Sequence, residues 1–131
     1  MNRNPRISEI AKILAILRVE HESYTYVDKI SQTSSKDLAL YYIREALRDY
    51  HSLMARGFPK TGQLAKNVSF EGAEREIEKI RGLSGAVELR EELSTITAQA
   101  LAEAARILSQ AEQEKSEKGE EREGAASGRG G

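Results

Sequence analysis

The sequence predicts an all-α protein, a small bundle of four to five helices. Apolar residues recur at three- and four-residue spacing along most of the chain. Capping residues and glycines separate these runs, and strand-like alternation over more than four residues is absent outside the segment 57–69. We therefore expect one helical domain over 1–111 and a disordered, acidic and glycine-rich tail over 112–131.

Two helices are expected before residue 34. The first runs from about Pro5 to Glu20, because Asn4 can cap free amides and proline tolerates the first helical position. A short second helix follows in the segment YTYVDKISQ, where Thr25 and Asp28 resemble a capping arrangement. The buried face of the first helix should carry Ile7, Ile10, Ile13, Leu14 and Leu17.

A long third helix is expected from about Lys36 to Arg56. Ser34 or Ser35 can cap its start, and Gly57 is a natural stop because glycine tolerates positive φ. Its core stripe includes Tyr50, which we read as packing. The expected stripe is Ala39, Leu40, Ile43, Ala46, Leu47, Tyr50, Leu53 and Met54.

Two further helices complete the bundle after a loop or small hairpin at 57–69. The fourth runs from about Glu71 to Arg81, with its many carboxylates, Glu76 among them, on a solvated face. The last follows Ser84 and is long enough to project past its neighbours. Its expected apolar stripe is Ala86, Leu89, Leu93, Ile96, Ala100, Ala104, Ile107 and Ala111.

Composition limits the classes of protein that fit. The chain has no cysteine, so disulfides and cysteine-based zinc sites are excluded. The most apolar segment, residues 7–19, is too short for a membrane span and contains charged residues. We therefore expect a cytoplasmic protein without a membrane partner. The net charge of −1 conceals a basic first half and an acidic second half, which suggests an anionic partner or contacts between copies.

The third helix also carries a band of basic and aromatic residues outside its core stripe. Arg44 and Arg48 are four residues apart, a spacing at which like charges repel. One interpretation is an ordinary solvated face, in which Glu45 pairs with Arg48 and Asp49 or another helix neutralises Arg44. The other is a surface for phosphates and a stacked base. The band consists of Tyr41, Arg44, Arg48 and His51.

The next part of the chain extends this positive charge. Arg56, Lys60 and Lys66 follow, with no aspartate or glutamate between Asp49 and Glu71. A loop of this kind can follow a phosphate backbone closely. We expect the helix band and the loop to form one continuous track, with affinity dominated by salt-sensitive phosphate contacts.

No constellation for catalysis, cofactor or metal binding is present in the sequence. The segment GFPKTGQLAK has two glycines at the interval of a phosphate-binding loop, but Gln63 and Leu64 stand where lysine and serine or threonine are needed. His21 and His51 do not form a paired-histidine metal pattern. We expect a protein that is not an enzyme and has no cofactor and no small-molecule substrate.

The pairing of YTYVDKI with ALYYIREALRDY, across a short serine-rich turn, resembles the small subunit of archaeal type I-A CRISPR interference complexes, the Cascade-like assemblies of antiviral defence. The resemblance covers about residues 7–56 and, less clearly, the last helix. It implies a non-catalytic helical protein, present in several copies beside the backbone subunits that hold the guide RNA and beside the large subunit. Its implied role is to help stabilise the opened loop of target DNA.

The residues that we carry over to a nucleic-acid contact are Arg44, Arg48, Arg56, Lys60 and Lys66, with Tyr41 and His51 beside them. The charge pattern fits DNA and RNA equally. The competing hypothesis is a helical protein–protein adaptor or regulator without a nucleic-acid role, which would use Ile107 and Leu108 at the exposed end of the last helix as its interface.

Overall fold

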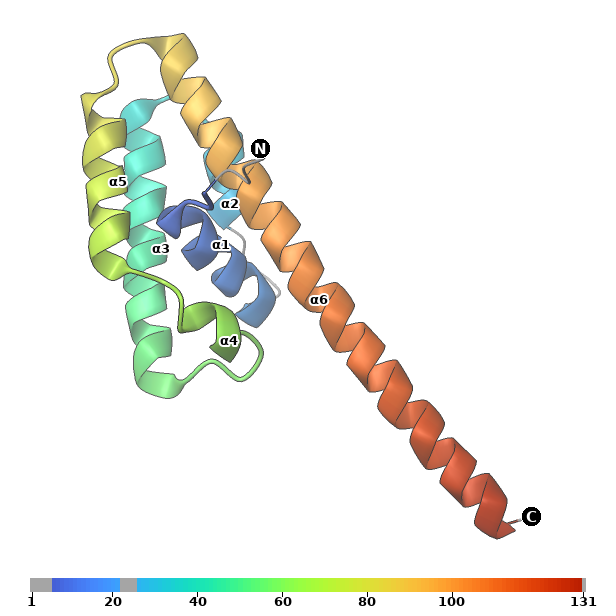
Figure 1. The fold of residues 1–131 in the computed structure, drawn as a ribbon. Helices are drawn as coiled ribbons and strands as arrows, with labels where there is room; N and C mark the ends of the chain where they lie inside the picture. The colour runs from blue at the N-terminus through green and yellow to red at the C-terminus, as the bar shows by residue number, and fades with distance from the viewer. Residues whose placement is uncertain (1–5, 22–25, 131) are drawn as a thin grey trace.

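The computed structural model describes the backbone of residues 6–21 and 26–130, and the side chains of these residues up to Glu112. In these ranges the chain is helical and contains no strand, which confirms the all-α class (Figure 1). The helices are α1 (Glu9–Glu20), α2 (Tyr26–Ser31), α3 (Lys36–Arg56), α4 (Gly62–Ala65), α5 (Phe70–Gly82) and α6 (Ala86–Gly130). The segment between α3 and α5 therefore contains a one-turn helix, α4, and not a hairpin.

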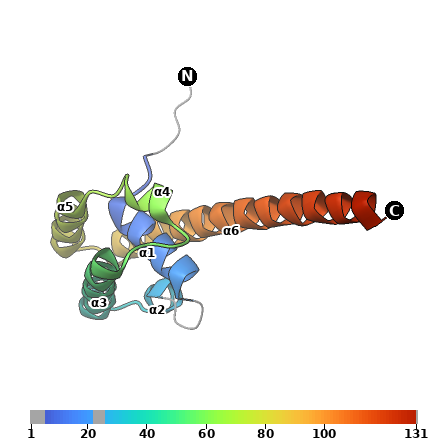
Figure 2. The same cartoon turned by 90° about the horizontal axis from the view of Figure 1, so that it is seen from below.

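Helix α1 is the centre of the bundle. Viewed from below, it lies among the other helices, with α3 and α4 on different sides of it (Figure 2). The sequence predicts one buried face, but α1 is buried nearly all round, as a helix with apolar residues on every side should be. Its fully buried apolar residues are Ile10, Ala11, Ile13, Leu14, Ala15, Ile16, Leu17 and Val19.

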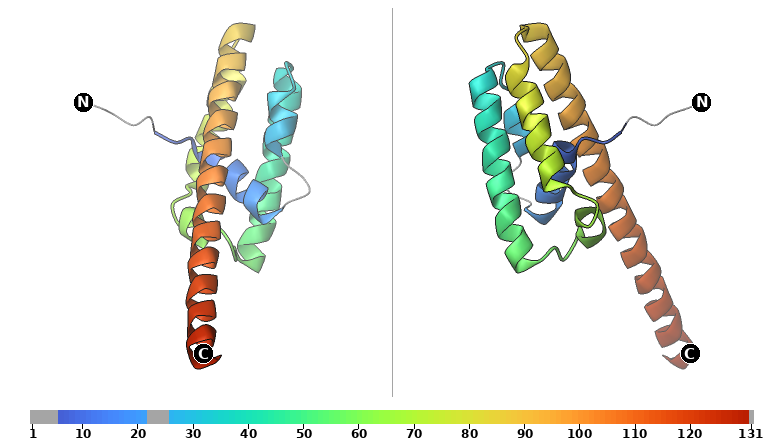
Figure 3. Two further views of the ribbon diagram at one scale, coloured as in Figure 1. Left: turned by 90° about the vertical axis from the view of Figure 1, so that its right-hand side faces the viewer. Right: turned by 60° about the vertical axis from the view of Figure 1, so that its left-hand side comes forward.

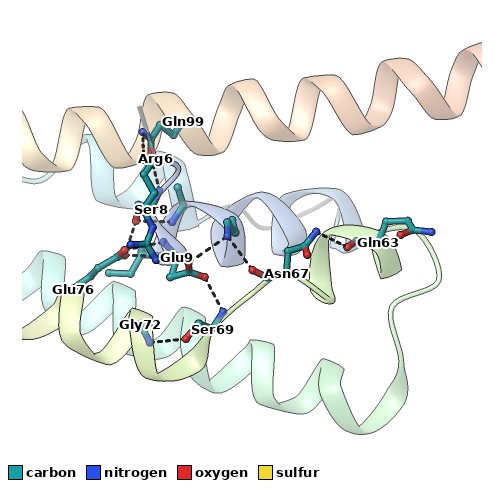
Figure 4. Close-up of polar contacts among 12 residues, drawn as sticks. Arg6, Ser8, Glu9, Gln63, Asn67, Ser69, Gly72, Glu76 and Gln99 are labelled. Atoms are coloured by element: carbon teal, nitrogen blue, oxygen red, sulfur yellow. Dashed lines mark hydrogen bonds and ion pairs between the residues drawn. The ribbon is translucent and has the colours of Figure 1, made fainter. Parts of the chain in front are cut away.

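The N-terminus of α1 is held by side chains from two distant helices. Ser8 caps the helix, because the Ser8 hydroxyl accepts a hydrogen bond from the Ala11 amide at 3.2 Å. The backbone amide of Ser8 donates to Gln99 Oε1 on α6 at 2.9 Å (Figure 4). Asn4, Pro5 and Thr25, which were expected to start the first two helices, lie outside the described residues.

Glu76 of α5 makes most of the remaining contacts to this helix end. Its carboxylate accepts hydrogen bonds from the Ser8 hydroxyl at 2.6 Å and from the amides of Glu9 and Ile10, both at 2.9 Å. A carboxylate at a helix N-terminus also interacts favourably with the helix dipole. The expectation that Glu76 lies on a solvated face is therefore wrong, because α1 starts directly against this side of α5.

The carboxylate of Glu9 is buried where α1 meets α5, with 3% of the residue exposed. Glu9 Oε1 accepts a hydrogen bond from the Ser69 amide at 2.7 Å, and Oε2 lies 3.3 Å from the ammonium of Lys12. Gly72 leaves the necessary space, since a Cβ atom built there would lie 2.8 Å from Cγ of Glu9. This buried charge is thus paired and hydrogen-bonded, as its burial requires.

Helix α3 begins and ends where the sequence predicts. The Ser35 hydroxyl accepts a hydrogen bond from the Leu38 amide, and Gly57 stops the helix at a φ of 103°. The buried stripe of α3 is centred near Ala39 and Tyr50. Met54 is 53% exposed, so the expectation that Met54 belongs to the core is wrong. At 100° per residue Met54 falls between the buried residues Ile43 and Leu47, so its exposure follows from its place in the last turn of the helix. The buried residues are Ala39, Ile43, Ala46, Leu47, Tyr50 and Leu53.

An aromatic cluster ties the end of α3 to the loop and to α5. The ring centroid of Tyr50, which is 4% exposed, lies 5.3 Å from that of Phe58 and 6.4 Å from that of Phe70. His51 meets the edge of Phe70 with a centroid distance of 4.6 Å. The prediction that Tyr50 is a packing residue is confirmed.

Helix α6 packs with its first half along the bundle and projects beyond it with the second half (Figures 1 and 3). Its predicted stripe is buried from Leu89 to Ala104, with Ile107 packed against the edge of the core, whereas Ala86 and Ala111 are exposed. The helical backbone continues to Gly130. Almost all side chains of the predicted tail, 112–131, lie outside the described residues, so its disorder stays a prediction.

Candidate nucleic-acid interface

The outer face of α3 presents four of the predicted contact residues together. Tyr41, Arg44, Arg48 and His51 are all exposed. At 100° per residue Tyr41, Arg44 and Arg48 lie on the side of the helix away from Ala39 and Ala46. His51 lies at the edge of this band, where its ring meets Phe70 at the border of the core. We call these four residues the α3 face.

Only part of the positive charge on the α3 face is neutralised. Arg48 lies 3.2 Å from the carboxylate of Glu45, but its side chain is 76% exposed, so the pair contributes little to stability. Asp49 does not neutralise Arg44, because the two residues lie about 140° apart around the helix. The Asp49 carboxylate instead accepts a hydrogen bond from the Tyr26 hydroxyl on α2. Within the described part of the chain, Arg44 has no ion-pair partner.

Two aromatic rings border these guanidinium groups. Tyr41 is 56% exposed, and its ring meets that of Tyr42 edge-on at a centroid distance of 5.6 Å. The His51 ring is braced by Phe70. Guanidinium groups bind phosphate oxygens, and exposed aromatic rings can stack on unpaired bases. The α3 face therefore has the residue types that a single-stranded nucleic acid requires, within a single helix.

The two lysines of the loop do not extend the α3 face. Carboxylate Oε2 of Glu20 accepts hydrogen bonds from the amides of Lys60 and Thr61, both at 2.9 Å, and from the Thr61 hydroxyl at 2.8 Å. These contacts draw the loop back against the end of α1. Figures 2 and 3 accordingly show α4 across α1 from α3, on the side of α6.

Lys60 and Lys66 instead line a groove of about 410 Å³ between the α4 segment and α6. Arg106 of α6 lies on the opposite wall, with its guanidinium group 2.7 Å from the carboxylate of Glu103. Phe58 and Ile107 add apolar surface. No sequence pattern pointed to Arg106, because 40 residues separate it from Lys66 and only the tertiary fold brings them together.

The predicted track is therefore two separate positive regions and not a continuous one. The α3 face forms the first, and the groove with Lys60 and Lys66 forms the second. Arg56 is exposed at the last residue of α3. Of the two predicted interface residues, Leu108 is 46% exposed, whereas Ile107 is half-buried beside the groove.

The described residues give no independent indication of a metal centre or a membrane span. They contain no group of three or more histidine, cysteine, aspartate or glutamate side chains placed to hold a metal ion. Among the helices in this part of the chain, none has both the length and the apolar character needed to cross a bilayer.

Comparison with known proteins finds a relative in an archaeon. The chain is 41% identical over 110 residues to an uncharacterized protein of Archaeoglobus fulgidus, an alignment that covers 82% of this chain and 95% of the relative. No protein-family model matches the sequence, and no solved structure matches it either.

Proposed function

This chain belongs to the same family as that Archaeoglobus fulgidus protein, and we propose that it is the non-catalytic small subunit of a CRISPR RNA-guided interference complex. In this role it contacts target DNA and the neighbouring backbone and large subunits, and it helps to stabilise the opened DNA loop. The archaeal source of the relative and the resemblance of residues 7–56 to archaeal small subunits support this proposal.

The observation that carries the nucleic-acid part is the exposure of the α3 face, together with a guanidinium group on Arg44 that has no ion-pair partner among the described residues. Arg44 lies one helical turn from Arg48, and both side chains are exposed. Their two guanidinium groups can therefore donate hydrogen bonds to phosphate oxygens. Contacts of this kind position a nucleic-acid backbone without reading its sequence. That suits a subunit that must accept any target.

The test is what co-purifies with a tagged copy of the full chain expressed in an archaeal host with an active interference system. The proposal predicts guide RNA, recognisable by its repeat-derived ends, together with the backbone and large subunits. An Arg44→Glu, Arg48→Glu variant should still join the complex but lower its affinity for target DNA. Recovery of neither guide RNA nor any of these subunits would contradict the proposal.

A second candidate is a helical adaptor with no nucleic-acid role, and the exposure of Leu101 and Leu108 on α6 favours it. The two leucines are seven residues apart on one side of the helix, so they can belong to one apolar patch of the kind that binds a protein. The same purification separates the two functions, because an adaptor would retain a stoichiometric protein partner after nuclease treatment and carry no guide RNA.

A further inference from the structure

The outer surface of α6 between Ser94 and Ala102 carries no charge, in a chain of which 31% is charged. Its exposed residues over this stretch are Ser94, Thr95, Ala98, Leu101 and Ala102. Ala105 and Leu108 continue the same side of the helix, and Leu101 and Leu108 are 41% and 46% exposed. Depletion of charge at the centre of a patch is the compositional signature of a protein interface.

The apolar residues of this surface follow a heptad spacing. From Ala98 the steps to Leu101, Ala105 and Leu108 are three, four and three residues, which places alternating small and large side chains in one line. Arg106, paired with Glu103, lies at the side of the groove. The exposed residues Glu91 and Glu112 bound the uncharged stretch at its two ends. We call Ala98, Leu101, Ala105 and Leu108 the α6 seam.

We propose that the α6 seam binds a second copy of this chain, with the two α6 helices antiparallel and related by a two-fold axis near residue 103. In this register Leu101 of each copy faces Ala105 of the other, and Leu108 faces Ala98. Each leucine thus meets a small residue. A two-fold contact requires a surface that is complementary to itself, and the α6 seam meets that requirement.

The size of the contact sets its expected strength. In this register the α6 backbones overlap over residues 86–120, about 51 Å at 1.5 Å per residue. Two helices about 10 Å across then cover on the order of 1,000 Å² in total, at the lower limit for a specific interface. The dimer should therefore be weak, with a Kd of about 10 µM or above, and neighbouring binding sites in a larger assembly would reinforce it. This inference rests on α6 alone and is independent of the proposed function.

Disulfide trapping tests the register, because the chain has no cysteine of its own. Ala98→Cys and Leu108→Cys variants, carrying different tags and mixed before mild oxidation, should give mixed dimers rapidly. Each variant alone should not, since identical positions would lie about 15 Å apart along the helix axis, beyond the reach of a disulfide. Rapid self-crosslinking of Ala98→Cys alone, or no crosslinking in the mixture, would overturn the antiparallel contact.

Analytical ultracentrifugation of the full chain at concentrations up to about 1 mM tests whether the α6 seam forms the dimer contact. Leu101→Glu should shift the monomer–dimer equilibrium at least tenfold toward monomer. Leu38→Glu is the matched control, because Leu38 on α3 is 42% exposed and Leu101 is 41% exposed. The Leu38→Glu variant should dimerise with the same Kd as the unmodified chain. Circular dichroism checks that both variants fold. A strictly monomeric chain, or equal effects of the two substitutions, would overturn the proposal.

Discussion

Replacement of Glu76 by alanine should destabilise the protein strongly, although a helical glutamate is ordinarily a surface residue. The carboxylate accepts three hydrogen bonds at the start of α1, from the Ser8 hydroxyl and the amides of Glu9 and Ile10. Hydrogen bonds to charged groups contribute about 1.5–3 kcal/mol each, and they are not additive within one carboxylate. Because water can reach part of this site, we expect a loss of about 3 kcal/mol in the free energy of unfolding.

Urea denaturation followed by circular dichroism measures this loss, which corresponds to a fall in Tm of roughly 10–15 °C for a domain of this size. Glu76→Gln keeps an acceptor oxygen but no charge, so it should lose about half as much. Glu74→Ala is the matched control, since Glu74 is exposed on the same helix and its substitution should change stability by less than about 0.5 kcal/mol. If Glu76→Ala were no worse than Glu74→Ala, the reasoning about the start of α1 would be refuted.

Three other predictions concern stability. Gly72→Ala should cost about 1–3 kcal/mol in urea denaturation because its Cβ atom would lie 2.8 Å from Cγ of Glu9, whereas Gly82→Ala meets no atom within 4 Å and should be neutral or slightly stabilising. Removal of the chain after Gln113 should leave Tm nearly unchanged, and a large drop would show that the removed segment docks on the bundle. Burial, with the negative charge of Glu9 in addition, raises the pKa of Tyr50 above its ordinary value of 10.0. The unfolded chain therefore ionises first, so stability should hold below about pH 10 and fall as the pH rises further, and Tyr50→Phe should reduce that fall in urea midpoints.

Local signals in the sequence were sufficient for most helix boundaries. Ser35 and Gly57 delimit α3 through short-range effects, a side-chain cap and a positive φ, which act within a few residues. The stripe of α6 likewise follows from periodicity alone. The short helix α4 was missed, because a single turn has no period to detect.

The parts that sequence reasoning could not predict depend on long-range contacts. Nothing near Glu76 indicates that it binds amides more than 65 residues away. Lys36 is similar, since its ammonium group donates hydrogen bonds to the carbonyl oxygens of Arg81 and Leu83 at the end of α5. The division of the basic residues has the same origin, because Glu20 holds the loop on the far side of α1 from the α3 face.

The most direct test of the account is the salt dependence of single-stranded DNA binding by the full chain, measured by fluorescence anisotropy. Arg44→Glu with Arg48→Glu should weaken binding at low salt by at least about tenfold. Two lost phosphate contacts should also reduce the slope of log K against log salt by about 1.4. Arg75→Glu with Arg90→Glu, at exposed positions on α5 and α6, changes the net charge equally and should have a much smaller effect. Equal loss in the two double variants, or unchanged binding by the first, would contradict a nucleic-acid role for the α3 face.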